Sequence, residues 1–360
     1  MKETLTAPVL SNQQLEKLIS DPAATARAVS LVYVNSAEEG ITRVKNGNGF
    51  KFKYRDKWIT KKSELQRILS LVLPPAWKDV WICVLPHGHL QATGKDAMNR
   101  KQYRYHPLWN ELRSKTKFFH LTEVGKALPR LREQLKKDLA LPGLPRNKVL
   151  AAVISLMEKT GIRIGNEFYE NLYGSFGLTT LKDKHVSIKG TAIRFTFRGK
   201  KGVEHQISLH SPKLAKIVKG CRDIPGKELF QYIDEEGKRQ SIESGMVNEY
   251  LKDNAGGEFT AKDIRTWCGT VAALNTFRQT GPFTTKTEGK KKILEVLDTV
   301  ALQLGNTRTV CKKYYVHPSL LELYENGKLN RWLRKGNGGI KKTVGLYEEE
   351  MQLMNILENI

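Results

Sequence analysis

Polar and apolar residues alternate in the first third of the chain, and this pattern predicts extended structure. Residues 50–54 (FKFKY) alternate with period two, as a half-buried strand does. Residues 80–85 (VWICVL) form a continuous apolar run that predicts a buried strand. The His87-Gly88-His89 segment predicts a turn into a further strand rather than a metal site, because no third ligand follows at a helical spacing. We expect residues 1–112 to form a small β-rich domain.

The apolar spacing becomes helical after residue 120. Residues 121–135 repeat leucine and valine every three or four positions, and residues 148–160 carry a similar stripe that ends at Gly161, a residue suited to a helix C-terminus. Residues 293–304 predict another helix, which stops at Gly305. We expect residues 113–360 to form a larger, mostly helical domain, with residues 110–120 as the linker between the two domains.

A short β segment interrupts the helical domain. Residues 186–188, 193–197 and 205–209 have strand character, and Gly199-Lys200-Lys201-Gly202 predicts the turn between the last two. These runs predict a small three-stranded antiparallel sheet. The fold class that follows is α+β.

Two segments near the end of the chain lack apolar residues. Residues 284–292 (TTKTEGKKK) predict a mobile, solvated loop. The glycine-rich residues 336–339 predict a break before a C-terminal helical extension, residues 340–360, whose final helix carries three consecutive glutamates.

Composition points to a polyanionic partner. The 360 residues include 60 Lys+Arg against 37 Asp+Glu, giving a net charge of +23. A basic protein without such a partner is the plainer alternative. The four cysteines are far apart and form no Cys-x-x-Cys pair, which argues against a zinc site and a disulfide framework and predicts reduced thiols. We expect neither a membrane span nor a secretory signal.

Arg163, Lys200, Arg265 and Tyr315 are candidates for attack on a phosphodiester. A tyrosine nucleophile needs fixed donors for the non-bridging oxygens, and the leaving alkoxide needs a proton. Arginine suits the first task and lysine the second. Each residue alone is a weak signal, because an isolated arginine is usually a surface ion-pair residue.

The order and spacing of these residues carry a resemblance. Four motifs follow one another along the chain: Thr160-Gly161-Ile162-Arg163, the Lys200 hairpin, Lys262-Asp263-Ile264-Arg265, and Leu304-Gly305-Asn306 with Tyr315 nine residues after Asn306. Together they resemble the tyrosine recombinase and type IB topoisomerase superfamily. Recombinases usually have His at the positions of Lys262 and Asn306. Residues 93–96 (TGKD), 101–106 (KQYRYH) and 175–181 (SFGLTTL) resemble the small poxvirus-like and bacterial type IB topoisomerases. The resemblance covers residues 33–325.

The resemblance implies a role for each candidate. Tyr315 is similar to the nucleophile that forms a 3′-phosphotyrosyl bond and frees a 5′-hydroxyl. Arg163 and Arg265 match the arginines that bind the scissile phosphate, and Lys200 matches the proton donor to the leaving oxygen. Asn306 stands where the viral members have His; an amide still donates an N–H but carries no charge.

Two neighbouring residues compete for these assignments. Tyr314 adjoins Tyr315, and the nine-residue offset from Asn306 selects Tyr315. Lys201 adjoins Lys200, and the Phe-Arg-Gly-Lys pattern selects Lys200.

Further residues are candidates for DNA contact. Tyr103 and Tyr105 match positions of the β domain that touch DNA, although two aromatics at this spacing are also typical of one packed face of a strand. We add basic residues close to these motifs: Lys101, Arg104, Lys201 and Lys262.

The implied activity is that of a topoisomerase that needs no ATP, metal or cofactor. It nicks one strand of duplex DNA, lets the strand rotate and religates it. The resemblance also implies a monomeric clamp around DNA and a cytoplasmic, nucleoid-associated protein. Two alternatives stay open: a tyrosine recombinase or integrase, and a non-catalytic DNA-binding protein on the same fold.

Overall fold

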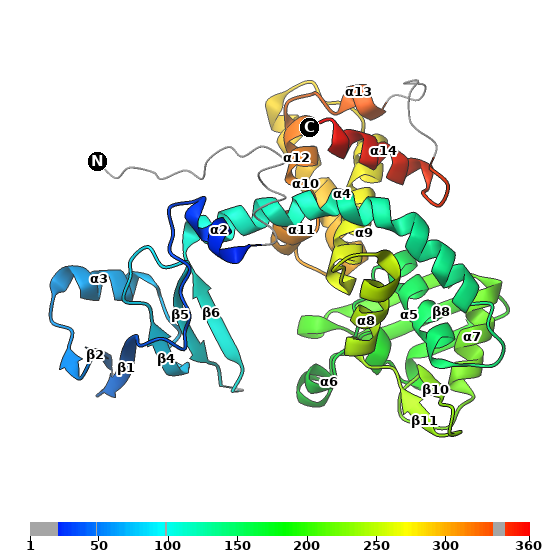
Figure 1. Cartoon of the computed structure of the whole chain (residues 1–360). Coiled ribbons are helices and arrows are strands. Elements are labelled where there is room, and N and C mark those ends of the chain that lie inside the picture. The colour runs from blue at the N-terminus through cyan, green and yellow to red at the C-terminus, as the bar shows by residue number, and fades with distance from the viewer. Residues whose placement is uncertain (1–20, 48, 98, 334–342) are drawn as a thin grey trace. The chain divides into compact units, whose positions relative to one another are not determined.

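The computed structural model describes residues 21–47, 49–97, 99–333 and 343–360, and the chain divides after Phe119 into two compact units (Figure 1). The division falls within one continuous helix, α4 (Pro107–Asp138). Residues 110–120, the predicted linker, are therefore helical. The start of α4 buries Trp109 and Leu112 in a small cluster of the first unit, and its later turns bury Leu121 and Leu128 in the main core of the second.

The first unit is built on a six-stranded antiparallel sheet in the order β3-β2-β1-β4-β5-β6. The strand predicted at residues 50–54 and the further strand predicted after His89 are confirmed, and the one predicted at 80–85 ends earlier, at Ile82. The elements of this unit are α2 (Pro22–Arg27), β1 (Ile41–Asn46), β2 (Gly49–Tyr54), β3 (Lys57–Trp58), α3 (Lys62–Ser70), β4 (Lys78–Ile82), β5 (Leu90–Lys95) and β6 (Lys101–Tyr105).

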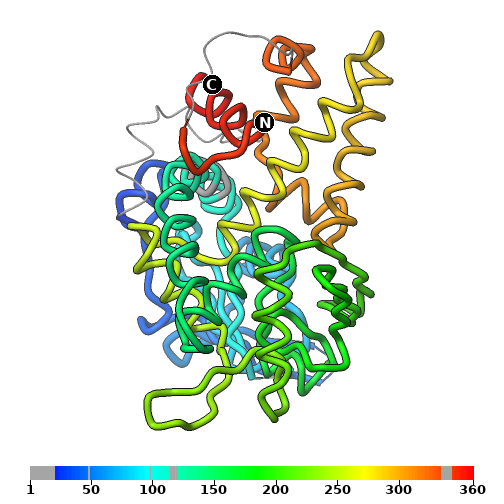
Figure 2. Tube along the Cα trace, turned by 90° about the vertical axis from the view of Figure 1, so that its right-hand side faces the viewer, coloured from blue at the N-terminus to red at the C-terminus, as the bar shows by residue number. Residues whose placement is uncertain are grey.

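The second unit is mostly helical, as predicted (Figure 2). After α4, its helices are α5 (Arg146–Thr160), α6 (Glu167–Tyr173), α7 (Pro212–Arg222), α8 (Ser244–Ala255), α9 (Ala261–Thr280), α10 (Lys286–Leu304), α11 (Arg308–Tyr314), α12 (Pro318–Glu325), α13 (Asn330–Leu333) and α14 (Glu348–Glu358). Its short 3₁₀ turns are η1 (Leu178–Thr180), η2 (Asp183–His185) and η3 (Lys200–Gly202).

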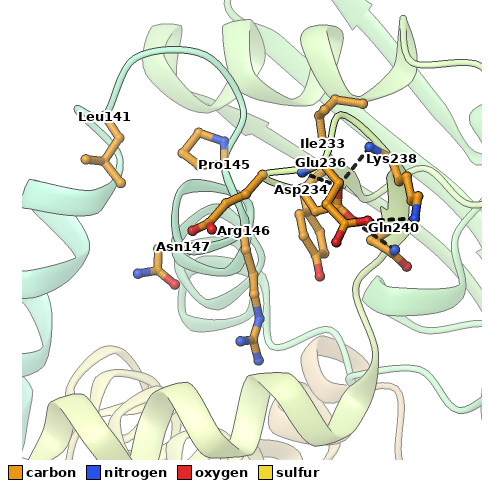
Figure 3. A pocket seen from close by; sticks show the side chains of 11 residues that line it. Leu141, Pro145, Arg146, Asn147, Ile233, Asp234, Glu236, Lys238 and Gln240 are labelled. Carbon is orange, nitrogen blue, oxygen red and sulfur yellow. Dashed lines mark hydrogen bonds and ion pairs between the residues drawn. The ribbon is translucent and has the colours of Figure 1, made fainter.

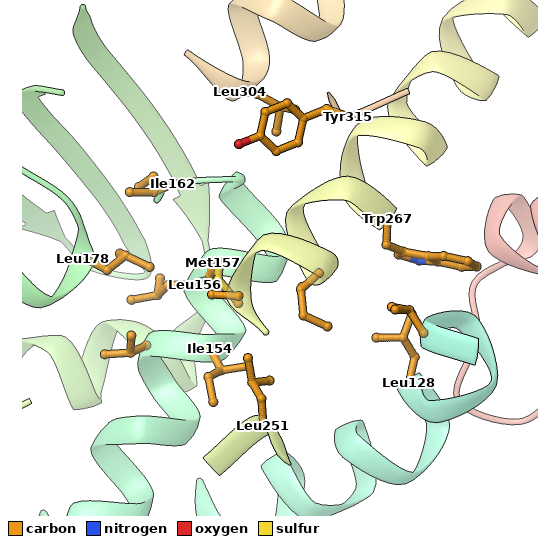
Figure 4. Close-up of a cluster of buried hydrophobic side chains, with 14 of the residues drawn as sticks. Leu128, Ile154, Leu156, Met157, Ile162, Leu178, Leu251, Trp267, Leu304 and Tyr315 are labelled. Carbon is orange, nitrogen blue, oxygen red and sulfur yellow. The ribbon is translucent and has the colours of Figure 1, made fainter. Parts of the chain in front are cut away.

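Helix α5 lies at the centre of this unit. Its side chains from Val149 to Met157 are all buried, so it presents no polar face, and it packs against α7, α8 and α9 (Figure 4). Gly161 ends the helix with φ 66°, a left-handed conformation that glycine adopts without strain. The prediction of a helix ending at Gly161 is confirmed.

The predicted antiparallel sheet is confirmed as β7 (Val186–Lys189), β8 (Ala192–Arg198) and β9 (Glu204–His210). A second hairpin, β10 (Gln231–Ile233) and β11 (Arg239–Ser241), lines an open pocket beside the start of α5 (Figure 3). Its turn is organised by Asp234, whose carboxylate accepts the backbone N–H of Glu236 and of Lys238.

The prediction of a solvated loop at residues 284–292 is wrong, because most of this segment forms the first turns of α10. Thr285 caps the helix by accepting the N–H of Glu288, and the Glu288 carboxylate accepts from the backbone and hydroxyl of Thr284. Lys292 pairs with Glu288 one turn later. Capping and charge pairing thus start a helix that has no apolar signal.

The predicted final helix is confirmed as α14, and it packs on α9 (Figure 1). Glu350 is buried, where it pairs with Arg132 and accepts the indole N–H of Trp267 at 2.9 Å. Arg132 also pairs with Glu158. This acidic helix is therefore part of the core of the unit. Residues 336–339, the predicted break, lie outside the described residues.

No helix in the described part of the chain is long and apolar enough to cross a membrane.

Candidate active site

Arg265 lies on the second turn of α9, at the centre of the candidate site. Its guanidinium donates from Nε to the carbonyl of Gly161 at 2.7 Å, from Nη2 to the carbonyl of Leu304 at 2.8 Å, and from Nη1 to the hydroxyl of Tyr315 at 3.0 Å. The side chain is 4% exposed. Arg265 therefore connects the end of α5 to Leu304 and Tyr315, which lie much later in the chain.

Arg163 follows the end of α5 and contacts the residues just after Leu304. Its Nη1 donates to the carbonyl of Gly305 at 3.0 Å, and its Nη2 donates to Oδ1 of Asn306. Gly305 ends α10 with φ 59°, which turns the next residue, Asn306, toward Arg163. The sequence thus folds here into two glycine-capped helix ends that face each other across the two arginines.

The two guanidiniums form a site of concentrated positive charge. Burial lowers the pKa of Arg163 to about 10, and the neighbouring Arg265 contributes to this shift. Burial lowers the pKa of Arg265 as well. Among the described residues, neither arginine forms an ion pair with a carboxylate; the oxygens they contact belong to uncharged groups. Such a pair favours a bound anion, which would supply the missing negative charge.

Tyr315 is held against α9 by its own backbone. Its carbonyl accepts the hydroxyl of Thr270 at 3.2 Å, and a Cβ placed on Gly269 would lie 2.7 Å from the same carbonyl. Only glycine therefore allows α9 to approach this closely. Figure 4 shows the Tyr315 ring beside Leu304, on the side of α9 away from Trp267.

The structure distinguishes Tyr315 from Tyr314. Tyr315 is 9% exposed, and its hydroxyl accepts a hydrogen bond from Arg265. Tyr314 is 37% exposed, and its ring lies near two lysine ammoniums, those of Lys262 at 5.8 Å and Lys313 at 5.3 Å. Of the two tyrosines, it is Tyr315 that the structure brings together with Arg265.

The contact that the structure gives Lys200 is with α6 rather than with the arginines or Tyr315. It begins η3, the turn between β8 and β9, and its Nζ is 5.4 Å from the centre of the Tyr169 ring on α6. Lys201 follows with φ 62°, an unusual conformation for a residue with a side chain. Both lysines are exposed. The structure thus gathers Arg163, Arg265, Asn306 and Tyr315, and leaves Lys200 turned toward α6.

The predicted DNA-contact residues are spread over both units. In the first unit, Tyr103 stacks on Tyr105 at 5.9 Å; Tyr103 is 49% exposed, whereas Tyr105 is half-buried and packs on Trp109. Lys101 donates to Ser36. Packing on one face of the strand therefore describes Tyr105, and DNA contact by either tyrosine stays a prediction. The basic candidates Lys101, Arg104, Lys201 and Lys262 are all exposed.

Sequence reasoning missed several residues that shape the site. Thr266 and Thr270 lie four residues apart on α9, and their hydroxyls donate to the carbonyls of Tyr314 and Tyr315. Their helical spacing after Arg265 was a usable signal. His205 on β9 is buried against Gly305, and nothing near it in the sequence indicates that contact. In the described part of the chain, no three His, Cys, Asp or Glu side chains are grouped as metal ligands would be.

Comparison with protein families gives two matches that together span most of the chain. Residues 107–334 match the family model described as the catalytic core of eukaryotic DNA topoisomerase I. Residues 49–96 match the N-terminal domain of bacterial DNA topoisomerase IB.

Individual relatives agree with these families. The chain is 35% identical over 298 residues to DNA topoisomerase 1B of Acanthamoeba polyphaga mimivirus, covering 80% of this chain and 88% of the relative. It is 24% identical over 235 residues to DNA topoisomerase I of Monkeypox virus, covering 65% and 72%. A solved XerH site-specific recombinase bound to its difH substrate is 14% identical, with a TM-score of 0.34 over 63% of this chain and 60% of that one. A TM-score this low is no evidence of a shared fold.

Proposed function

The chain belongs to the type IB DNA topoisomerase family, whose members nick and religate DNA, and we propose that it does so through Tyr315. In this proposal the Tyr315 phenol gives up its proton to the solvent, and its oxygen attacks a backbone phosphorus. A Tyr–O–P bond forms at the 3′ end, and the bond from phosphorus to the 5′-oxygen breaks. The 5′-oxygen leaves as a hydroxyl after it gains a proton. The free strand end rotates and then attacks the phosphotyrosine, which restores the DNA and the phenol.

The observation that carries this proposal is the arrangement around Arg265. The buried guanidinium of Arg265 and the half-buried one of Arg163, neither with a carboxylate partner, flank the Tyr315 hydroxyl, which Arg265 contacts at 3.0 Å. A phosphate beside that hydroxyl would meet donors from Arg163 and Arg265 at its non-bridging oxygens, where negative charge develops. Because the energy of the phosphodiester is kept in the Tyr–O–P bond, the cycle requires no ATP.

We assign the proton on the leaving 5′-oxygen to Lys200. Its turn, η3, joins two strands and exposes both lysines, and the proposal requires this turn to bend toward bound DNA. The ammonium leaves the Tyr169 ring when it moves to the 5′-oxygen. The ammonium is exposed, and a cation–π contact at an exposed site is weak, roughly 0.5–1 kcal/mol, so phosphate contacts at the DNA offset its loss.

Asn306 has a different part in the proposal. Its Oδ1 accepts from Arg163, so the amide orients that arginine. Its Nδ2 lies 3.4 Å from the carbonyl of Leu304, a long contact that it can exchange for a phosphate oxygen. An amide can both accept from Arg163 and donate to phosphate because its oxygen and nitrogen are separate groups.

Relaxation of a negatively supercoiled plasmid tests the proposal. The purified chain should relax the plasmid in excess EDTA, without ATP, and at protein concentrations that leave it monomeric. A requirement for paired specific sites would identify a recombinase instead. Binding without a covalent adduct on any duplex would identify a non-catalytic DNA-binding protein. An absolute requirement for magnesium would contradict the metal-independent mechanism.

We further propose that the protein acts as a monomer on duplex DNA in the cytoplasm, in association with the nucleoid. Its net charge of +23 supports the DNA partner, because phosphate contacts by Lys and Arg supply affinity that does not depend on sequence. Exposed Lys101, Arg104, Lys201 and Lys262 are our candidates for such contacts.

A further inference from the structure

His205 is a buried imidazole that the mechanism above does not use. It lies on β9 directly opposite Phe197 of β8, and the two rings stack at 4.8 Å with their planes 10° apart. The side chain is 7% exposed. Stacking on the neighbouring strand fixes the ring in the sheet, so its outer edge has a defined position.

That edge lies against two glycines from different parts of the site. A Cβ placed on Gly199 would be 2.6 Å from Nε2 of His205, and a Cβ placed on Gly305 would be 2.5 Å from the same atom. Real side chains do not approach this closely, so both positions require glycine as long as His205 is present. The Nε2 edge of the His205 ring therefore lies between the Gly199 and Gly305 backbone segments and keeps them apart.

The two segments carry the groups that must act together. Gly199 directly precedes Lys200, the proposed proton donor. Gly305 accepts from Arg163 through its own carbonyl, and it stands between Leu304, whose carbonyl accepts from Arg265, and Asn306. The ring thus separates the base of the lysine turn from the loop that orients both arginines.

The charge around His205 keeps this spacer neutral. Burial is the main cause that lowers its pKa, and the guanidiniums of Arg163 and Arg265 lower it further. A protonated imidazole would place a third cation beside two that already lack carboxylate partners. A neutral ring fills the space without adding to that repulsion.

We propose that His205 is a positioning residue that sets the distance between the Lys200 turn and the arginine-bearing Gly305 loop. This inference rests on the proposed function, because it assumes that Lys200 and the arginines act on the same phosphodiester. When DNA draws the turn toward the scissile bond, the fixed ring at its base limits how far Lys200 moves relative to Arg163.

His205→Ala tests the proposal in single-turnover cleavage of two substrates. One has the normal 5′-oxygen at the scissile bond, and the other has sulfur there and needs little protonation because a thiolate leaves readily. We expect cleavage of the oxygen substrate to slow by about 10- to 100-fold, the effect of misplacing a catalytic group by roughly 1 Å. The sulfur substrate should recover most of that loss, and DNA affinity should stay within about twofold of the wild type.

His210→Ala is the matched control, because His210 lies on the same strand and is exposed. It should cleave both substrates at the wild-type rate. If folded His205→Ala cleaves the oxygen substrate at the wild-type rate, the proposal is overturned, whatever happens to stability. It is also overturned if the variant is equally slow on both substrates, because the ring would then position the arginines alone.

Gly199→Ala tests the same contact with the histidine in place, and it decides the matter if His205→Ala does not fold. Gly199 has φ −92°, so alanine adopts its backbone conformation without strain and the main obstacle is Nε2 of His205. We expect slow cleavage of the oxygen substrate, recovery on sulfur, and partial relief when His205→Ala is added. Wild-type cleavage by Gly199→Ala overturns the proposal.

The proposed function fails separately from this inference. Tyr315→Phe cleaving either substrate would remove the proposed nucleophile whatever the His205 variants do. If the wild-type chain cleaves both substrates and Tyr315→Phe cleaves neither, the proposed nucleophile stands, and the His205 variants then test the positioning role by itself.

Discussion

Replacing Arg265 by alanine should reduce both stability and cleavage, whereas replacing Arg163 should reduce mainly cleavage. Arg265 is 4% exposed and donates to the carbonyls of Gly161 and Leu304. Truncation leaves the buried Gly161 carbonyl without a donor and the Leu304 carbonyl with only the long contact from Asn306, and a buried acceptor that loses its donor costs about 1–3 kcal/mol. Removing a buried cation beside Arg163 offsets part of this loss, so we expect a net destabilisation of about 2–4 kcal/mol.

Arg163 and its partner Asn306 are both half-buried, and its contact with the Gly305 carbonyl is only partly buried, so water replaces the lost donor more readily than at Arg265. We therefore expect Arg163→Ala to lose no more than about 1 kcal/mol of stability. Both variants should cleave DNA about 10²- to 10⁴-fold more slowly, because each loses a donor to the transition state. DNA affinity should fall much less, since many other cations contact phosphates.

Urea unfolding gives the stability of each variant, and single-turnover cleavage of a short duplex gives the rate. The reasoning is refuted if Arg265→Ala unfolds at the wild-type midpoint with an unchanged slope, since the two buried carbonyls would then not depend on it. Near-normal cleavage with collapsed binding, in either variant, would make the arginines DNA anchors rather than transition-state donors.

Three further predictions follow from the same contacts. Glu350→Gln should destabilise the chain by about 1–3 kcal/mol in urea, because the half-buried Arg132 loses one of its carboxylates; a wild-type midpoint would show that α14 does not depend on the pair. His317 caps α12 through a neutral Nδ1, and burial lowers its pKa to about 4. The folded state therefore binds fewer protons than the unfolded state, and stability is lost as pH falls from 6.5 toward 4. The stability difference from His317→Asn, measured across that range, should be flat above 6.5 and shrink below it; no change would contradict the assignment. Lys200→Ala should be strongly impaired on normal DNA and largely rescued by sulfur at the 5′ position, with Lys201→Ala near wild type on both; rescue of Lys201→Ala instead would move the acid one residue along the turn.

Local patterns predicted the elements that hold the site. Residues 148–160 and Gly161 identified α5 and its end, and the glycines around Lys200 identified the turn between β8 and β9. The order of the motifs indicated Arg163, Arg265 and Tyr315 as a group. Each of these signals lies within a short stretch of sequence, where apolar spacing and capping residues directly indicate the local structure.

What the sequence did not reveal depends on contacts between distant residues. The start of α10 comes from capping by Thr285 and Glu288 instead of apolar spacing. Glu350 reads as a surface residue in an acidic run, yet Arg132 and Trp267 pair with it in the core. His205 touches Gly305 across about a hundred residues of chain. None of these pairings has a local pattern that would indicate its partner.

The central claim is that the Tyr315 hydroxyl is the nucleophile. Tyr314 is its natural control, because it is adjacent, also a tyrosine and more exposed. Each variant, Tyr315→Phe and Tyr314→Phe, is incubated with end-labelled duplex DNA, denatured and resolved on a gel that separates protein–DNA adducts from free strand. The account predicts that Tyr314→Phe forms the adduct and relaxes plasmid, and that Tyr315→Phe does neither while binding DNA normally. A covalent adduct formed by Tyr315→Phe would contradict it.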